Sequence, residues 1–175
     1  MGACELPASL PGVTTPAQQL ALFTGGGGGG GGPSSYSIDN QLTNDPTYNV
    51  ISLEAYKVGA FAGGFHTAFP VTIQLTGNEL DSATCGACVL GFGGVHNSSW
   101  TGSYFATGGT VVLTALSKTR IAGKLKNITL THISYGAEHT TPLNDGCNTT
   151  VEELDFDAVP SMSFTSPGLL RFPWR

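Results

Sequence analysis

The chain of 175 residues is long enough to form one domain with a sizeable hydrophobic core. Only 11% of its residues are charged, against about 25% in an average globular protein. The net charge is −5 with just 7 Lys and Arg, which argues against a nucleic-acid-binding protein, since such a protein needs clustered basic side chains.

Hydroxyl and amide side chains supply the polarity that charged residues do not, with 21 Thr, 14 Ser and 8 Asn. Thr fits the pleated surface of a strand because its Cβ is branched, and strong helix formers such as Lys and Glu are scarce. The composition therefore predicts an all-β fold. No apolar run reaches the 18 residues expected of a membrane-spanning helix.

Residues 1–33 differ in composition from the rest and are predicted to form an N-terminal extension. Its last part is a run of glycines from Gly25 to Gly32. Glycine loses more conformational entropy on ordering than any other residue, so we expect this run, including Gly28, to be ordered only by packing against a neighbour. The stretch from Ala17 to Phe23 is the one place where a helical turn or two is predicted.

Residues 34–160 alternate short strand candidates with turn residues. This pattern is typical of an antiparallel β-sandwich of about seven to nine strands, with a barrel as the alternative. A bulge is predicted near Lys126-Asn127, and Gly108-Gly109 is predicted to be a turn. The predicted strands are Tyr48–Val58, Pro70–Thr76, Cys88–Phe92, Trp100–Ala106, Thr110–Leu116, Arg120–Ser134 and Val151–Val159.

Residues 161–175 are predicted to form a C-terminal extension that docks on its own domain or on a partner. Large apolar side chains gain nothing from exposure in a free terminus. The candidates for such a contact are Phe164, Leu170, Phe172 and Trp174.

The four cysteines are interpreted mainly as disulfide partners, because the composition suggests an extracellular protein. A bond from Cys147 to Cys85 or Cys88 would close a loop of about 60 residues and stabilise the fold by roughly 4 kcal/mol, leaving one cysteine for Cys4. A bond between Cys85 and Cys88 is the alternative. A further hypothesis is a zinc site whose ligands are Cys85, Cys88, Cys147 and His96.

A redox site at Cys85-Gly-Ala-Cys88 would need a helix to follow the motif, whereas the residues after it predict a strand. The small residues before Cys4 resemble the mature start of a bacterial lipoprotein, so a lipid anchor at Cys4 is also considered.

Three further groups of residues are candidates for binding or modification. Trp100 and Tyr104 share a strand face by period two and could stack on a sugar ring, although core packing explains them as well. Asn97, Asn127 and Asn148 fit the N-glycosylation acceptor pattern. The oxygen-bearing side chains of the remaining group suggest either calcium binding or turns, and they are Asp39, Asn40, Asn44 and Asp45.

Three stretches carry a resemblance to a known group of proteins: Gly102–Leu113, Ile121–Leu130 and Gly146–Val151. They resemble a pattern found in secreted or lipoprotein β-sandwich domains of deltaproteobacteria, including myxobacteria. The resemblance covers roughly residues 48–159. It implies a fold and an extracellular location, and it implies no activity.

The sequence has no nucleophile elbow, phosphate-binding loop or metalloprotease motif, so we expect a non-enzyme without cofactor or metal. We predict a secreted or cell-surface structural protein that forms a homo-oligomer or polymer, with its two extensions contacting neighbouring subunits in a filament or surface layer. The alternative is a monomeric cell-surface module that binds glycans or another extracellular ligand.

Overall fold

The structure is a computed structural model that describes residues 4–10, 18–24, 35–65, 68–97, 99–135 and 140–161, and strands dominate these residues. They form a ten-stranded sheet, and no α-helix occurs in them. The strands are β1 (Ser9–Leu10), β2 (Gln18–Thr24), β3 (Ser35–Gln41), β4 (Tyr48–Tyr56), β5 (Val71–Gln74), β6 (Ala87–Val95), β7 (Gly102–Leu116), β8 (Ile121–Tyr135), β9 (Thr140–Pro142) and β10 (Asn148–Ala158). Two short 3-10 helices, η1 (Gly59–Phe61) and η2 (Gly77–Leu80), precede β5 and β6.

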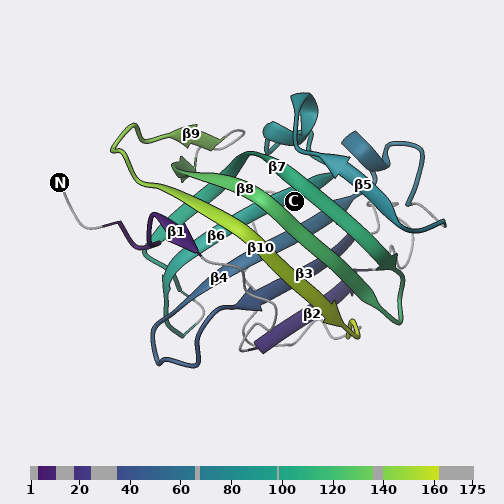
Figure 1. Ribbon diagram of the computed structural model, residues 1–175, viewed down its shortest axis with the longest axis horizontal. Helices are drawn as coiled ribbons and strands as arrows, with labels where there is room; N and C mark the ends of the chain where they lie inside the picture. The colour runs from purple at the N-terminus through teal and green to yellow at the C-terminus, as the bar shows by residue number, and fades with distance from the viewer. Residues whose placement is uncertain are drawn as a thin grey trace.

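The sheet is curled into two layers that cross each other (Figure 1). Its strand order is β1-β10-β8-β7-β6-β4-β3-β2, with β5 paired to β7 and β9 paired to β8. All of these neighbours are antiparallel except β1 and β10, which are parallel. The predicted all-β fold is confirmed, and the two layers share one core as the sheets of a sandwich do.

The two ends of the curled sheet meet along a seam between β2 and β10. The side-chain amide of Gln19 replaces a strand partner there: its Nε2 donates to the carbonyl of Asp155 (3.2 Å), and its Oε1 accepts from the N–H of Asp157 (3.1 Å). Beyond β10, Ser161 bonds through its backbone to Ala21 and Phe23. These contacts satisfy backbone groups that would otherwise be open at the sheet edges.

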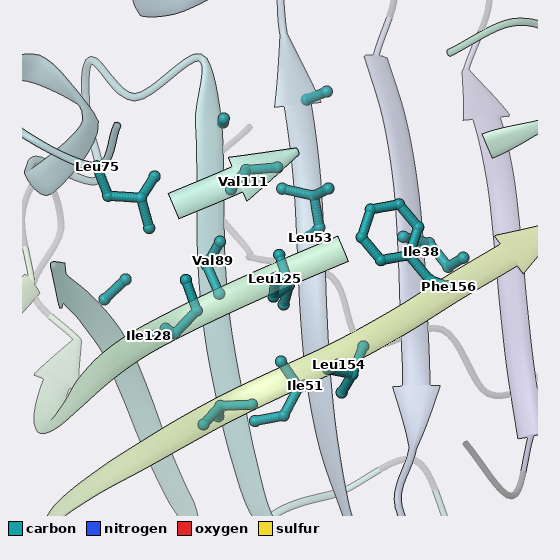
Figure 2. Packing of buried hydrophobic residues seen from close by; sticks show 14 of the residues in the cluster. Ile38, Ile51, Leu53, Leu75, Val89, Val111, Leu125, Ile128, Leu154 and Phe156 are labelled. Carbon is teal, nitrogen blue, oxygen red and sulfur yellow. The ribbon is translucent and has the colours of Figure 1, made fainter. Parts of the chain in front are cut away.

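The interior between the layers is filled with apolar side chains. Ile38 and Ile51 come from one layer, Leu125 and Leu154 from the other, and all four are fully buried. Figure 2 shows them interdigitating, with β8 and β10 crossing the strands behind them. The inside of the curled sheet is therefore a packed core.

A bend runs through the neighbouring strands β7 and β8 and lets the sheet fold back on itself. In β7 the core-facing positions change from even numbers, such as Ala106, to odd numbers, such as Val111. The register of β7 against β8 shifts at this point, where Gly109 (φ 125°) and Asn127 (φ 50°) adopt left-handed backbone conformations. Such a bulge bends a strand and increases its twist. The bulge predicted near Lys126-Asn127 is confirmed, whereas the turn predicted at Gly108-Gly109 is wrong.

Two predictions about the N-terminal third are corrected by the structure, and one strand there was missed. Ala17–Phe23 was expected to be helical, but Gln18–Thr24 forms β2, because its apolar side chains reach the core in an extended chain. Strand β3 was not predicted. Residues 4–10 and 18–24 belong to the sheet and its core, so the ordered domain begins before residue 34. The glycine run from 25 to 32 lies outside the described residues.

The two adjacent glycines in β7 give a matched test of the bend. A Cβ at Gly109 would lie 2.6 Å from Ile128 Cδ1 and 2.9 Å from the Asn127 carbonyl oxygen, whereas a Cβ at Gly108 would meet nothing within 4 Å. We predict that Gly109→Ala lowers the free energy of unfolding by about 2 kcal/mol or more, while Gly108→Ala changes it by less than about 1 kcal/mol. Urea denaturation measures both, and equal effects would contradict the assigned role of Gly109.

Candidate functional site

The N-terminal segment is fixed at one end of the sheet by a disulfide between Cys4 and Cys147. From there the chain runs beside β10, where the N–H of Thr150 donates to the carbonyl of Ala8 (3.0 Å), and the side chain of Leu6 is fully buried. The disulfide, the short strand β1 and the buried leucine together make this segment part of the fold.

A chain of polar contacts runs through the same end. The Tyr104 hydroxyl donates to Glu5 Oε2 (3.1 Å), and its ring stacks on the imidazole of His132 at 4.9 Å. His132 Nδ1 in turn donates to Asp145 Oδ2 (2.6 Å), and Asp145 Oδ1 accepts from the N–H of Cys147 (2.9 Å). Burial raises the pKa of Tyr104, and the Glu5 carboxylate raises it further, so the phenol stays protonated and acts as a donor.

The Asp145 carboxylate lies at the solvent-exposed end of this chain of contacts. The N–H of Cys147 and then the His132 side chain stabilise its charged form, and they hold the pKa of Asp145 below its usual value. An open hollow of about 410 Å³ lies beside it. The hollow is lined by Thr131, Asn144, Asp145, Gly146, Cys147 and Asn148.

A histidine bonded to an aspartate supplies two of the three members of a hydrolytic triad, and the third is a nucleophile. The hydroxyl that lines it belongs to Thr131, which donates to Asn148 Oδ1 (2.9 Å). Three residues here could in principle hold a metal ion: His132, Asp145 and Cys147. The sulfur of Cys147 is bonded to Cys4, however, so only two ligands remain in this group. These contacts therefore anchor the 144–148 turn.

Cys85 and Cys88 form the second disulfide. Disulfide bonding of the cysteines is confirmed, and so is the alternative bond between Cys85 and Cys88. The other expected pairing, from Cys147 to one of these two, is wrong, because Cys147 is bonded to Cys4. All four sulfurs are engaged, so the zinc set with His96 does not form. The Cys4 sulfur is likewise not free to carry a lipid in this structure.

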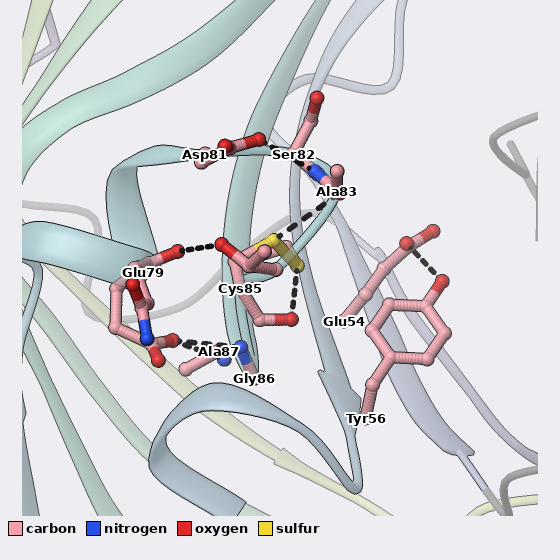
Figure 3. The surroundings of a disulfide bond; sticks show 12 residues. Glu54, Tyr56, Glu79, Asp81, Ser82, Ala83, Cys85, Gly86 and Ala87 are labelled. Atoms are coloured by element: carbon pink, nitrogen blue, oxygen red, sulfur yellow. Dashed lines mark hydrogen bonds between the residues drawn. A yellow bond between two sulfur atoms is a disulfide. The ribbon is translucent and has the colours of Figure 1, made fainter. Parts of the chain in front are cut away.

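A buried carboxylate that the sequence analysis did not identify supports the Cys85–Cys88 loop. Glu79 is only 6% exposed, yet it accepts three backbone N–H bonds. Ala60 donates to Oε1 (2.7 Å), and Gly86 (2.9 Å) and Ala87 (2.6 Å) donate to Oε2, the latter two shown in Figure 3. Three donors satisfy a buried carboxylate well. Glu79 thus ties η1 and η2 to the start of β6, a role visible only once the three segments are in place.

The aromatic platform proposed from period two does not exist in the structure. Tyr104 is completely buried, and Trp100 belongs to a different cluster, where its ring packs on Phe92 at 5.0 Å. Trp100 Nε1 donates to Ser103 Oγ (2.6 Å). The platform fails because β7 begins at Gly102, so Trp100 lies before the strand and does not share its alternation.

The other predicted site residues are placed as follows. Asn97, Asn127 and Asn148 are all exposed, as a glycosylation acceptor must be. The predicted calcium ligands Asp39 and Asn40 both lie in β3. Asp39 accepts from the Ser52 hydroxyl of β4, whereas the Asn40 amide donates to the Ile51 carbonyl. They therefore do not converge with Asn44 and Asp45 on a calcium ion. The assembly candidates lie outside the described residues: Gly25, Gly28, Gly32, Phe164, Leu170, Phe172 and Trp174.

Comparison of the chain with protein-family models, with curated proteins and with solved structures finds no match. The resemblance to deltaproteobacterial domains therefore stays a prediction. Within the described ranges, no helix has the length and apolar character needed to cross a membrane.

The two disulfides should differ in what they contribute to stability. The bond between Cys4 and Cys147 spans 143 residues and that between Cys85 and Cys88 spans 3. In the chain-entropy description the first is worth about 5 kcal/mol and the second about 1.5 kcal/mol. We predict that the double variant Cys4→Ala/Cys147→Ala loses clearly more unfolding free energy than Cys85→Ala/Cys88→Ala in denaturant titrations. The reverse order would show that the N-terminal segment is not held as described.

Proposed function

We propose that the chain is a non-catalytic extracellular structural subunit that assembles with copies of itself through its C-terminal segment. The observation that carries this proposal is the packed interior of the curled sheet. A sheet that binds a small molecule inside leaves space for it, whereas here Ile51, Leu125 and Leu154 fill the centre. The functional surface is then on the outside of the sheet.

The polar groups of the candidate site support a structural role. Their hydrogen bonds hold loops and the N-terminal segment in place. This is true of Glu79, of the Glu5–Tyr104 pair and of the His132–Asp145 pair. Catalytic groups, by contrast, need a reacting atom within hydrogen-bond reach. The arrangement therefore favours a scaffold over an enzyme.

The disulfides and the surface chemistry favour an extracellular location. Two disulfides are compatible with an oxidising compartment, where such bonds form and persist. The charged side chains of β8 and β10 largely neutralise one another, with Lys124 bonded to Glu153 (2.9 Å) and Asp155 (3.0 Å). Much of the remaining surface carries hydroxyls and amides, which can pack against another copy at little electrostatic cost.

Of the two extensions, the C-terminal one is the better candidate for assembly. Residues 4–10 and 18–24 are already part of the sheet or its core. Of the N-terminal extension, only the glycine run is therefore left as a candidate for contacts with neighbouring subunits. The C-terminal segment follows Ser161, which bridges to Leu22 at the seam. A segment that leaves from a seam can contact its own sheet or that of a neighbour, and contacts to neighbours that do not close on themselves propagate.

Self-association of the full chain tests the proposal. We expect concentration-dependent large species in sedimentation velocity and regular assemblies in negative-stain electron microscopy. Phe172→Ser/Trp174→Ser should weaken association by about tenfold or more, because buried aromatics contribute most to interfaces. The control is Val159→Ser, since Val159 is apolar and 77% exposed but lies before the segment. A wild-type chain that stays monomeric at the highest attainable concentration would rule out assembly.

A further inference from the structure

Strands β4 and β6 are buried on both faces, although only one face looks into the core. On β4, Ile51 and Leu53 face the core, so alternation places Val50 and Ser52 on the opposite side. These two side chains are nevertheless only 3% and 0% exposed. On β6, Leu90 is likewise fully buried on the side away from the core. Something covers the outside of the sheet here.

The cross-strand register shows that these residues form one continuous surface. One row across the strands runs Asp39, Ser52, Leu90, Phe105, and the next pairs Val50 with Phe92. A third pairs Glu54 with Cys88. We call this surface the outer face and define it by Asp39, Val50, Ser52, Glu54, Leu90 and Phe92. Trp100 packs over Phe92 and covers one end of it.

Two carboxylates are buried within this apolar surface. Asp39 and Glu54 are each only 5% exposed. Ser52 Oγ donates to Asp39 (2.6 Å), and the Tyr56 hydroxyl donates to Glu54 (Figure 3). Both carboxylates have further partners besides these hydroxyls. A buried negative charge is costly unless it is compensated, so positive charge together with apolar surface is the chemistry that complements this face.

We propose that the outer face is the docking site of residues 162–175 of this chain. The segment has the required chemistry: it contains Phe164, Leu170, Phe172 and Trp174, together with two of the three arginines of the chain and no carboxylate side chain. Arginine is the residue best suited to a buried ion pair with a carboxylate. Arg171 and Arg175 thus complement Asp39 and Glu54, and the aromatic side chains complement Val50 and Leu90.

The connection from the seam is short enough for this contact. The described chain reaches Ser161, which bridges to Leu22 of β2, and β3, β4 and β6 follow in order across the sheet. Neighbouring strands are about 4.8 Å apart, so the outer face begins within about 10 Å of the seam. Fourteen residues reach up to about 46 Å when extended. The inference deepens the proposed function by naming the receptor surface, but it also holds if the segment docks on its own chain.

Photo-cross-linking of the full chain tests the contact. A benzophenone amino acid in place of Phe172 is illuminated, and the cross-linked peptides are identified by mass spectrometry. We expect the main cross-links in β4 and β6, at or beside Val50, Ser52 and Leu90. Adding Arg171→Glu/Arg175→Glu should reduce their yield at least several-fold. Lys118→Glu/Arg120→Glu, a matched charge reversal in the β7–β8 turn, should leave the yield unchanged.

Mixing chains of normal and heavy isotope composition separates this inference from the proposed function. Cross-links on the outer face within one chain or between chains both support the docking site, and only those between chains support assembly through this segment. Cross-links confined to other strands, or a yield insensitive to the arginine reversal, would overturn the docking site. If the chain polymerises while the outer face carries no cross-link, the inference fails and the assembly proposal stands.

Discussion

The rest of the structure depends on the bend at Gly109 and Asn127. It turns β7 from one layer into the other, so that β8 and β10 cross over the strands from β2 to β6. Without it, a sheet of this many strands would expose one apolar face along its whole length. With it, Leu125 and Leu154 meet Ile51 in one core, and the two sheet edges come close enough for Gln19 to join them.

Closure of the sheet explains why so many polar side chains have structural roles. A curled sheet has open ends, and loops must cover them without leaving backbone groups unpaired. Glu79 does this beside the Cys85–Cys88 loop by accepting three N–H bonds. At the end of the sheet where Cys4 is bonded to Cys147, Asp145 holds its turn through Cys147 and His132. Such clusters of ionisable groups resemble an active site in composition. Their hydrogen bonds, however, are made to backbone N–H groups and to one another.

The predictable parts of the fold are the strands in which apolar and polar residues alternate regularly along the sequence. Alternation located β8 and β10, including the inward side chains Leu154 and Phe156, because a period of two is visible in sequence. Residues 18–24 were misread because a short apolar run fits a helix or a strand equally well. Strand β3 was missed because its core side carries the polar Asn40, whose amide bonds to the Ile51 carbonyl.

The parts that were not predictable depend on distant contacts. Disulfide connectivity is fixed by which loops the fold brings together, and nothing local indicates that Cys4 reaches Cys147 across 143 residues. The same holds for Glu79, whose three donors come from two separate loops. The outer face was also hidden, because a continuous apolar run such as β6 indicates that both faces are buried but not what covers the second face.

Burial of β4 and β6 on both sides supports the proposed role of the C-terminal segment most directly. Solvent paramagnetic relaxation of methyl groups in the full chain measures this at individual side chains. The account predicts that Val50 and Leu90, on the outer face, are protected from a soluble paramagnetic probe as well as Leu53 and Val89 in the core. Strong relaxation at Val50 and Leu90 with protection at Leu53 and Val89 would contradict it.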